Sequence, residues 1–201
     1  MLHCESEIIT DYLAVSPIVN WKHPTIEAKA SMLFKPSMTD IEKIQNAFTF
    51  VRDQISHSWD IQSERVTCTA LETLTAREGI CYAKSHLLAA LLRSANIPTG
   101  FCYQRLLLFD NADSSFCLHA LNAVFVESVN RWVRMDARGN KPGVQAEFSL
   151  ETEKLAFQPD PSKGEYDDMF IRVHPHAETV RVLQENQNAI QMYLHHLPVH
   201  L

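Results

Sequence analysis

The chain has 201 residues, of which 46% are hydrophobic and 21% are charged, and its formal net charge is −6. This composition predicts one globular domain over residues 1–201 and excludes a disordered chain, while the negative charge without any basic run argues against nucleic acid as a partner. The N-terminal sequence MLHCESEIITDYLAV lacks the pattern of a signal peptide, and no apolar run is long enough for a membrane span. We therefore expect a cytoplasmic protein without a membrane partner.

The cysteines are five in number and have no paired spacing. They are Cys4, Cys68, Cys81, Cys102 and Cys117. An odd, scattered set predicts free thiols rather than a disulfide framework or a zinc site of the CxxC type. No cofactor is expected.

The helices are predicted in the first half of the chain. The first 36 residues, which are broken by prolines, are expected to form a short strand or an extended arm. Thr39 and Glu42 have capping-box spacing before a helical apolar pattern that ends near position 56. A second such pair, Thr69 and Glu72, predicts a short helix that stops at Gly79.

A third, amphipathic helix follows Cys81 almost at once, with alanines and leucines at helical spacing. From Gly100 the apolar pattern becomes strand-like. Strands are predicted at residues 101–109, 118–126 and 131–136, with turns at residues 110–115 and 127–130. Helices followed by antiparallel strands predict an α+β fold with a core at about residues 37–140.

Residues 141–201 are predicted to form a C-terminal extension that ends in an amphipathic helix from about His176 to His196. The acidic stretch at residues 165–168 lacks a calcium-loop pattern, and we interpret it as a solvated surface loop that could cover the cleft as a lid. His174 and His176 could bind a metal from one strand face, but no cysteine or carboxylate spacing completes a ligand set. No metal site is therefore predicted.

Three residues have the types and positions that cysteine catalysis needs. Cys81 lies at a helix N-terminus, where the helix dipole and unpaired backbone N–H groups favour a thiolate. A thiol nucleophile also needs a base, usually histidine, and a third group that orients this base. His119 begins a strand in CLHALNAVFV, and Asp136 ends the next strand in NRWVRMDARG. A cysteine on a helix, followed by a histidine and an aspartate on strands, is a coherent catalytic arrangement.

The sequence around these residues resembles the transglutaminase-like superfamily, the papain-related group that includes bacterial transglutaminase-like proteins and peptide N-glycanases. The resemblance rests on Gly-Ile-Cys at 79–81 with its leucine-rich helix and Ala-Asn-Ile-Pro turn, on His119, and on Trp-Val-Arg-Met-Asp at 132–136. It covers about residues 65–140. It implies a papain-like fold in which Cys81 is the nucleophile, His119 the base and Asp136 the orienting carboxylate. It also implies attack on an amide to give a thioester acyl-enzyme, which water or an amine then resolves.

Two features depart from the family pattern. An aromatic residue is common two positions after the histidine, whereas this chain has Leu121 there. A two-residue hairpin turn would pair Asp136 with Ala123, which lies four residues, or roughly 13 Å, from His119 along its strand. A bulge or a bend would then be needed to bring the carboxylate to the imidazole.

The negatively charged oxygen of the tetrahedral intermediate needs at least two hydrogen-bond donors. The backbone N–H of Cys81 is the natural first donor. Trp59, in the sequence HSWD, is the predicted second donor, because related enzymes often use an aromatic or amide donor upstream. Tyr82, Tyr103 and Gln104 are candidate cleft residues on proximity in sequence alone.

Each of these residues also has a purely structural interpretation. A lone cysteine is most often a buried thiol, and a lone histidine at a strand start is most often an ordinary hydrogen-bonded residue. Asp136 by itself is most simply a strand-end carboxylate, and Trp59 a core aromatic. The joint arrangement of Cys81, His119 and Asp136 favours catalysis.

The leading hypothesis is a cysteine-dependent amide hydrolase or acyltransferase that acts on peptide, protein or glutamine-like substrates, with a small amine as a potential acceptor. The alternative is a catalytically silent module of the same fold that binds peptides or proteins. A lesser alternative is acyl transfer as in arylamine N-acetyltransferases, which use a similar Cys-His-Asp set but are longer and differ around the cysteine. The residues leave hydrolysis and transfer open, because cleft shape decides between them.

Overall fold

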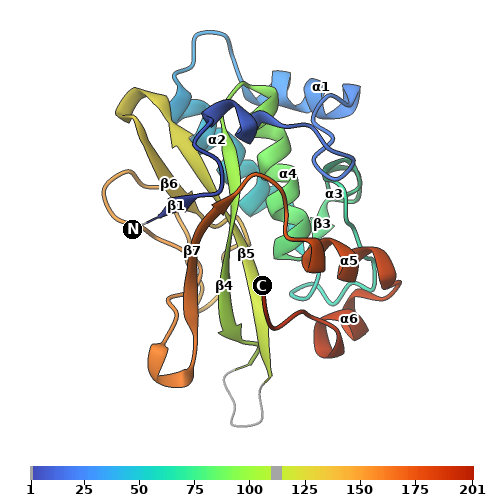
Figure 1. Ribbon diagram of the computed structural model, residues 1–201. Helices are drawn as coiled ribbons and strands as arrows, with labels where there is room; N and C mark the ends of the chain where they lie inside the picture. The colour runs from blue at the N-terminus through green and yellow to red at the C-terminus, as the bar shows by residue number, and fades with distance from the viewer. Residues whose placement is uncertain (1, 110–114) are drawn as a thin grey trace.

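A five-stranded sheet packs against a group of helices (Figure 1). The computed structural model describes residues 2–109 and 115–201. In spatial order the strands are β1 (His3–Cys4), β7 (Tyr166–Arg172), β4 (Thr99–Leu107), β5 (Phe116–Val126) and β6 (Arg131–Met135). Neighbouring strands are antiparallel apart from the parallel pair β1–β7. The predicted α+β class and its three central strands are confirmed, whereas the turn predicted at 110–115 lies, except for Ser115, outside the described residues.

Helix α4 (Cys81–Ser94) is the centre of the fold. It contacts β5 on one side, and it contacts α1 (Pro24–Leu33), α2 (Asp40–Gln54) and α3 (Ala70–Ala76) on its other sides. Every residue from Cys81 to Arg93 is buried, so the helix is enclosed all round rather than along one stripe. The predicted packing of this helix on an antiparallel sheet is confirmed.

Arg93 shows how a polar side chain is accommodated in this central helix. Its guanidinium donates hydrogen bonds to the carbonyl oxygens of Ala14 (2.7 Å), Thr99 (2.7 Å) and Val173 (2.6 Å). Burying a charged group is tolerated when its donors are satisfied in this way. These bonds tie the end of α4 to the start of β4 and to two segments that are distant in the sequence.

Both predicted capping boxes are confirmed. In α2 and in α3 the N-cap threonine accepts a hydrogen bond from the glutamate N–H three residues on, and that glutamate accepts one from the threonine N–H. Helix α3 ends at Ala76, earlier than predicted, because Arg77 adopts a left-handed conformation with φ of 59°. Glu78 and Gly79 then form the short strand β3, so they are not helical.

The first 36 residues contain more helix than expected. A 3₁₀ helix, η1, spans Ile9–Leu13, and α1 begins at Pro24. Pro24 occupies the first helical position, where its missing N–H costs nothing, and His23 Nδ1 accepts a hydrogen bond from the N–H of Thr25. The prediction of only a strand or an extended arm was therefore wrong, because this proline starts a helix.

The C-terminal extension ends in two helices rather than one. These are α5 (Ala177–Glu185) and α6 (Ala189–His195). The single helix predicted from His176 to His196 is interrupted because the Asn188 side chain accepts hydrogen bonds from the N–H groups of Ile190 and Gln191. Asn188 thus starts a new helix, as asparagine at an N-cap commonly does.

The acidic stretch at residues 165–168 was predicted as a surface loop, and this prediction was wrong. Residues 166–172 form β7, which pairs with β4. The carboxylate of Asp167 pairs with Arg134 at 2.7 Å, and that of Asp168 pairs with Arg172. The charges of this segment alone favour a solvated loop, but each of these two aspartates has an arginine partner.

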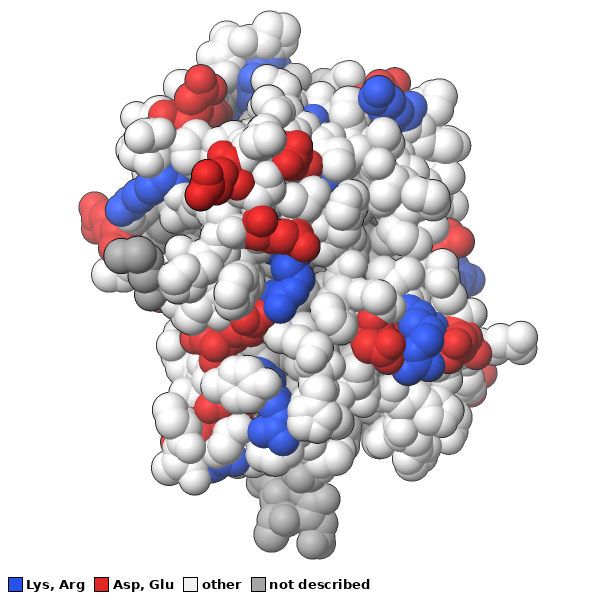
Figure 2. Space-filling view, in the orientation of Figure 1, with Lys and Arg blue, Asp and Glu red and all other residues white. Residues whose placement is uncertain are grey.

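Charged side chains of both signs are interspersed on the face shown in Figure 2. Ion pairs account for part of this pattern: Arg181 on α5 lies 2.6 Å from both Glu178 and Glu185. No extended basic surface forms on this face. The remaining elements are the short strand β2 (Ser56–His57) and two 3₁₀ turns, η2 (Glu127–Val129) and η3 (Pro161–Lys163). Within the described ranges no helix is long and apolar enough to cross a bilayer.

Candidate active site

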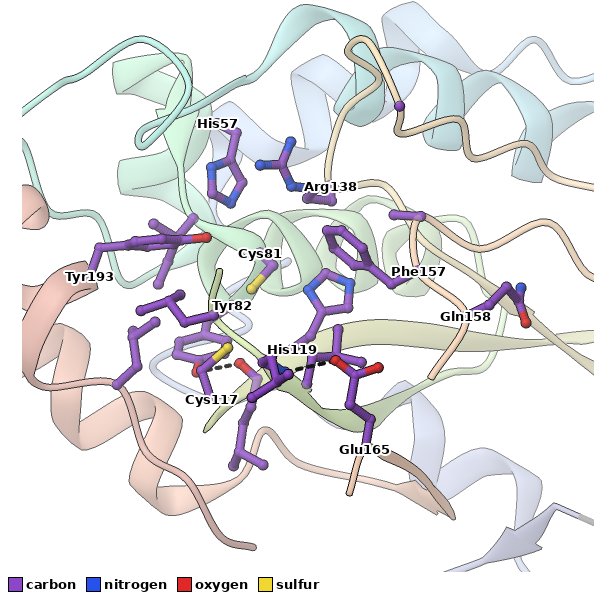
Figure 3. Close-up of a pocket in the computed structure, with 18 residues that line it drawn as sticks. His57, Cys81, Tyr82, Cys117, His119, Arg138, Phe157, Gln158, Glu165 and Tyr193 are labelled. Atoms are coloured by element: carbon purple, nitrogen blue, oxygen red, sulfur yellow. Dashed lines mark hydrogen bonds between the residues drawn. The ribbon is translucent and has the colours of Figure 1, made fainter. Parts of the chain in front are cut away.

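A cavity of about 410 Å³ opens at the N-terminus of α4. Its wall combines this helix end with strands β4 and β5, the segment at residues 156–158 and helix α6. Cys81, His119, His57 and Arg138 are among its polar residues, and Figure 3 shows these side chains converging on one space. Much of the remaining wall is apolar. The cavity therefore combines apolar walls with a few convergent polar groups, as ligand-binding sites commonly do.

Cys81 is held at this cavity because α4 is fastened to β5. Cys81 is the first residue of α4. The hydroxyl of Tyr82 donates a hydrogen bond of 2.7 Å to the carbonyl of Leu118, and the amide of Asn122 donates one of 3.2 Å to the carbonyl of Ser85. Both bonds join the first turns of the helix to the strand that carries His119. Asn122 has no local sequence signal that would predict this contact.

His119 lies on β5 with its imidazole beside the sulfur of Cys81 (Figure 3). Burial lowers the pKa of this histidine, but the neighbouring charges of Asp136 and Cys81 outweigh burial and raise its pKa to about 10. The imidazole is thus stabilised as a cation at neutral pH.

Asp136 reaches His119 because the β5–β6 hairpin has a longer turn than predicted. Asn122 pairs with Met135, so Ala123 lies opposite Arg134 rather than Asp136. The 3₁₀ turn η2, followed by Asn130 in a left-handed conformation, takes up the additional residues. The predicted register was wrong by two residues, and this shift keeps Asp136 on the same face while halving its separation from His119 along the strand. The described β5–β6 ladder contains no bulge.

The carboxylate of Asp136 is fully buried and accepts three hydrogen bonds. His119 Nε2 lies 2.7 Å from Oδ2, and the N–H groups of Arg138 and Ala156 donate at 3.1 Å each. Burial raises the pKa of this carboxyl, but the charge of His119 and these hydrogen bonds outweigh burial and lower it. A carboxylate only accepts hydrogen bonds, so His119 Nε2 carries a proton and Nδ1 is the ring nitrogen left to face Cys81. The ring of Phe157 covers the imidazole edge-on, with ring centroids 5.0 Å apart.

The two other charged groups in the wall are already paired. Arg138 donates to both carboxylate oxygens of Asp60, at 2.5 and 2.8 Å. The Glu165 carboxylate accepts hydrogen bonds from the N–H groups of Leu107 (2.9 Å) and Asp160 (2.8 Å). Neither charge is therefore free to bind a ligand without losing a partner.

The other predicted site residues are distributed differently from the expectation. Tyr82 lines the cavity, whereas Trp59, Tyr103 and Gln104 lie outside its wall. The Trp59 indole stacks on Tyr193, with ring centroids 4.5 Å apart. The hydroxyl oxygen of Tyr103 accepts a hydrogen bond of 2.7 Å from the backbone N–H of His176.

Gln104 lies directly opposite His119 in the β4–β5 pairing, and its side chain donates to Asp167 at 2.9 Å. Sequence proximity failed for Tyr103 and Gln104 because the side chains that reach the cavity begin only further along β4, at Leu106.

His57 is a cavity residue that the sequence analysis missed. It belongs to the two-residue strand β2 (Ser56–His57), which pairs in parallel with β3 (Glu78–Gly79). The pairing sets His57 beside Gly79, two residues before Cys81. Two such short strands carry no periodic sequence signal, so this pairing could not be read from the chain.

The late histidines do not gather with other metal-binding side chains. His174 is exposed, and His176 is half-buried at the start of α5. Within residues 2–109 and 115–201, no group of three or more His, Cys, Asp or Glu side chains could hold a metal ion.

Known proteins resemble this chain at the level of the family and the fold. Residues 27–137, more than half of the chain, match the family model of the transglutaminase-like superfamily. A solved structure from Cytophaga hutchinsonii, described as a candidate cysteine protease, is 20% identical with a TM-score of 0.53, covering 66% of this chain and 43% of that chain. This likeness indicates a shared fold.

A candidate protease from Parabacteroides distasonis is more remote. It is 15% identical with a TM-score of 0.40, covering 62% of this chain and 25% of that chain. This chain spans less than half the length of either structure. No curated protein matches the chain.

Proposed function

The chain belongs to the transglutaminase-like superfamily, and from that premise we propose that it is a cysteine-dependent amide hydrolase or acyltransferase. Cys81 is the nucleophile, His119 the acid and base, and Asp136 the group that orients the imidazole. The observation that carries the proposal is one buried chain of contacts: Cys81 lies beside His119, whose Nε2 bonds Asp136, at the wall of a single cavity. Peptide amides and glutamine-like amides are the proposed substrates.

The first half of the reaction forms a thioester. The Cys81 thiolate attacks the amide carbonyl carbon, a C–S bond forms, and the C=O π electrons move onto oxygen. When this electron pair returns, the C–N bond breaks, and the leaving nitrogen takes the proton from His119 Nδ1. The amine departs, and the acyl group remains on sulfur.

The second half releases the acyl group. Water or an amine attacks the thioester carbonyl and gives its proton to Nδ1 of His119. The C–S bond breaks, and the sulfur leaves as a thiolate beside the imidazolium. Asp136 keeps the proton on Nε2 throughout, so that Nδ1 can alternate between base and acid.

The test is intact-protein mass spectrometry of wild type, Cys81→Ala and Cys117→Ala. Cys117 is the matched control, because its thiol lines the same cavity on β5. The proteins are incubated with glutamine-containing peptides and other peptide amides, with and without a primary amine. We expect an acyl adduct on wild type and on Cys117→Ala but none on Cys81→Ala. Release as free acid identifies hydrolysis, and release as a new amide identifies transfer.

A binding module of the same fold gives a different result. Its wild-type protein would be folded yet form no adduct and turn over no substrate. Iodoacetamide labelling of Cys81 below pH 7 adds a second criterion: fast, selective labelling is expected of a thiolate paired with His119, and its absence favours the binding module.

A further inference from the structure

His57 is fixed next to the nucleophile through the main chain. The N–H of Ser58 donates to the carbonyl of Gly79 at 3.2 Å, and the N–H of Ser56 donates to the carbonyl of Arg77 at 2.9 Å. Paired strands lie roughly 4.8 Å apart, so His57 is set one strand spacing from the backbone that leads into Cys81. Its position does not depend on a flexible loop.

The ring of His57 is enclosed and incompletely hydrogen-bonded. The residue is only 4% exposed, and its ring enters the cavity between Tyr193 and Arg138 (Figure 3). Within the described residues its Nδ1 is buried and has no hydrogen-bond partner. Buried polar atoms are usually paired, and this Nδ1 is enclosed without a partner in the described part of the chain, so Nε2 is the ring nitrogen left to meet a ligand in the cavity.

The charge state of His57 follows from its surroundings. Burial lowers the pKa of this histidine well below its usual value, and the positive charge of Arg138 lowers it further. Asp60 acts in the opposite direction, while Lys84 and His119 again lower it. The ring is therefore neutral at pH 7 and carries one N–H. A proton on the enclosed Nδ1 would be an unsatisfied donor, so the proton is better placed on Nε2.

We propose that His57 is the second donor of the oxyanion-binding site, with its Nε2–H directed at the substrate oxygen together with the backbone N–H of Cys81. This inference rests on the proposed function, since it assigns a donor to the same thioester-forming step. When Cys81 attacks, the oxygen gains negative charge, and preorganised donors stabilise it. A neutral imidazole can serve as such a donor without a change of protonation state.

Trp59, the donor predicted from the sequence, is the natural comparison. Its ring stacks on Tyr193, with ring centroids 4.5 Å apart, and lies tilted against Phe109, with ring centroids 5.7 Å apart. Trp59→Phe removes the indole N–H and keeps an aromatic ring in this stack. It therefore separates the role predicted for Trp59 from the one assigned to His57.

The test measures acylation and alkylation of Cys81 in the same proteins. The variants are His57→Phe, which keeps a ring without a donor, His57→Gln, which restores an N–H, and Trp59→Phe. Acylation is followed by intact mass in single turnovers of a substrate that acylates the wild type. Alkylation by iodoacetamide is the second readout, because that reaction builds no charge on a carbonyl oxygen.

The expected result is selective. His57→Phe should acylate about 10²- to 10³-fold more slowly than wild type while its alkylation rate stays within about twofold. His57→Gln should recover part of the acylation rate, and Trp59→Phe should resemble wild type. Equal acylation by wild type and His57→Phe overturns the inference, as does a parallel loss of acylation and alkylation, which identifies a structural role. Alkylation without any acylation in wild type instead contradicts the proposed function itself.

Discussion

The imidazole of His119 and the carboxylate of Asp136 share a buried hydrogen bond of 2.7 Å, although His119 lies on β5 and Asp136 directly follows the end of β6. In Asp136→Asn the amide can donate to Nε2, which reverses the tautomer and places a proton on Nδ1, where the base must accept one. We expect acylation of Cys81 to fall about 10²- to 10⁴-fold, as measured in single turnovers. The exposed Asp53 is the control, since Asp53→Asn removes the same charge outside the cavity. Unchanged acylation in Asp136→Asn would remove this aspartate from the mechanism.

The same pair predicts how stability depends on pH. Burial lowers the pKa of His119, but the charges of Asp136 and Cys81 outweigh burial and raise this pKa to about 10. The contribution of His119 to the free energy of unfolding is therefore complete below its ordinary pKa of 6.5 and is lost as pH rises towards 10. Burial raises the pKa of Asp136, but its partners outweigh burial and lower this pKa. The contribution of Asp136 to stability is therefore complete above its ordinary pKa of 3.8 and is lost in acid. The free energy of unfolding of wild type should therefore exceed that of His119→Gln, and this difference should be larger at pH 5 than at pH 9.

Urea unfolding at pH 5, 7 and 9 measures this difference. The exposed His174, replaced by glutamine in the same way, serves as the control. A difference between wild type and His119→Gln that is constant over this range would contradict the ion pair.

Lys84 predicts a pH dependence of the opposite sign. Its buried ammonium donates to the carbonyls of Arg52 and Ile55, at the end of α2 just before β2. Burial, reinforced by Arg138, lowers its pKa from 10.5 to about 7. Between these values the unfolded chain holds a proton that the folded chain has released, so stability rises with pH. Wild type should gain stability relative to Lys84→Met between pH 7 and 10.

Thermal and urea unfolding of the two proteins across that interval give the measurement. Lys35→Met, at an exposed position, controls for loss of a lysine charge. Parallel curves for wild type and Lys84→Met would mean that Lys84 stays charged when the protein is folded.

The apolar wall of the cavity predicts a preference among acyl donors. The wall includes Leu106, Phe157 and Leu197. The guanidinium of Arg138 is already paired with the carboxylate of Asp60. Donors with an apolar side chain next to the carbonyl should therefore be preferred over charged ones. Leu197→Asp should raise the KM for an apolar donor about tenfold, since a polar wall forfeits about 1–2 kcal/mol of burial.

Steady-state kinetics with leucine, glutamine and glutamate donors test this preference. Met32→Asp, a change at a surface residue of α1 that is 77% exposed, is the control and should leave KM unchanged. Equal kcat/KM for apolar and charged donors would contradict the role of the wall.

The features that depend only on neighbours along the chain could be predicted from the amino-acid sequence. The capping boxes at Thr39 and Thr69, the helix that starts at Cys81, and the three central strands all have local patterns, and each is present. A helix start depends on groups within one turn, and a strand on alternation over a few residues. The fold class was therefore predictable, and Cys81 stood out through its place before a leucine-rich helix.

The way in which residues distant in the sequence meet became visible in the folded chain alone. The turn over Glu127–Val129 moved the register that brings Asp136 to His119, and the β2–β3 pairing brought His57 rather than Trp59 to the cavity. Pairing between strands is a long-range choice, in which a shift of two residues preserves every inward and outward position, so alternation cannot distinguish the two registers. Strands of two residues leave no periodic trace at all. The types of the catalytic candidates could be read from the chain, but their distances are properties of the folded protein.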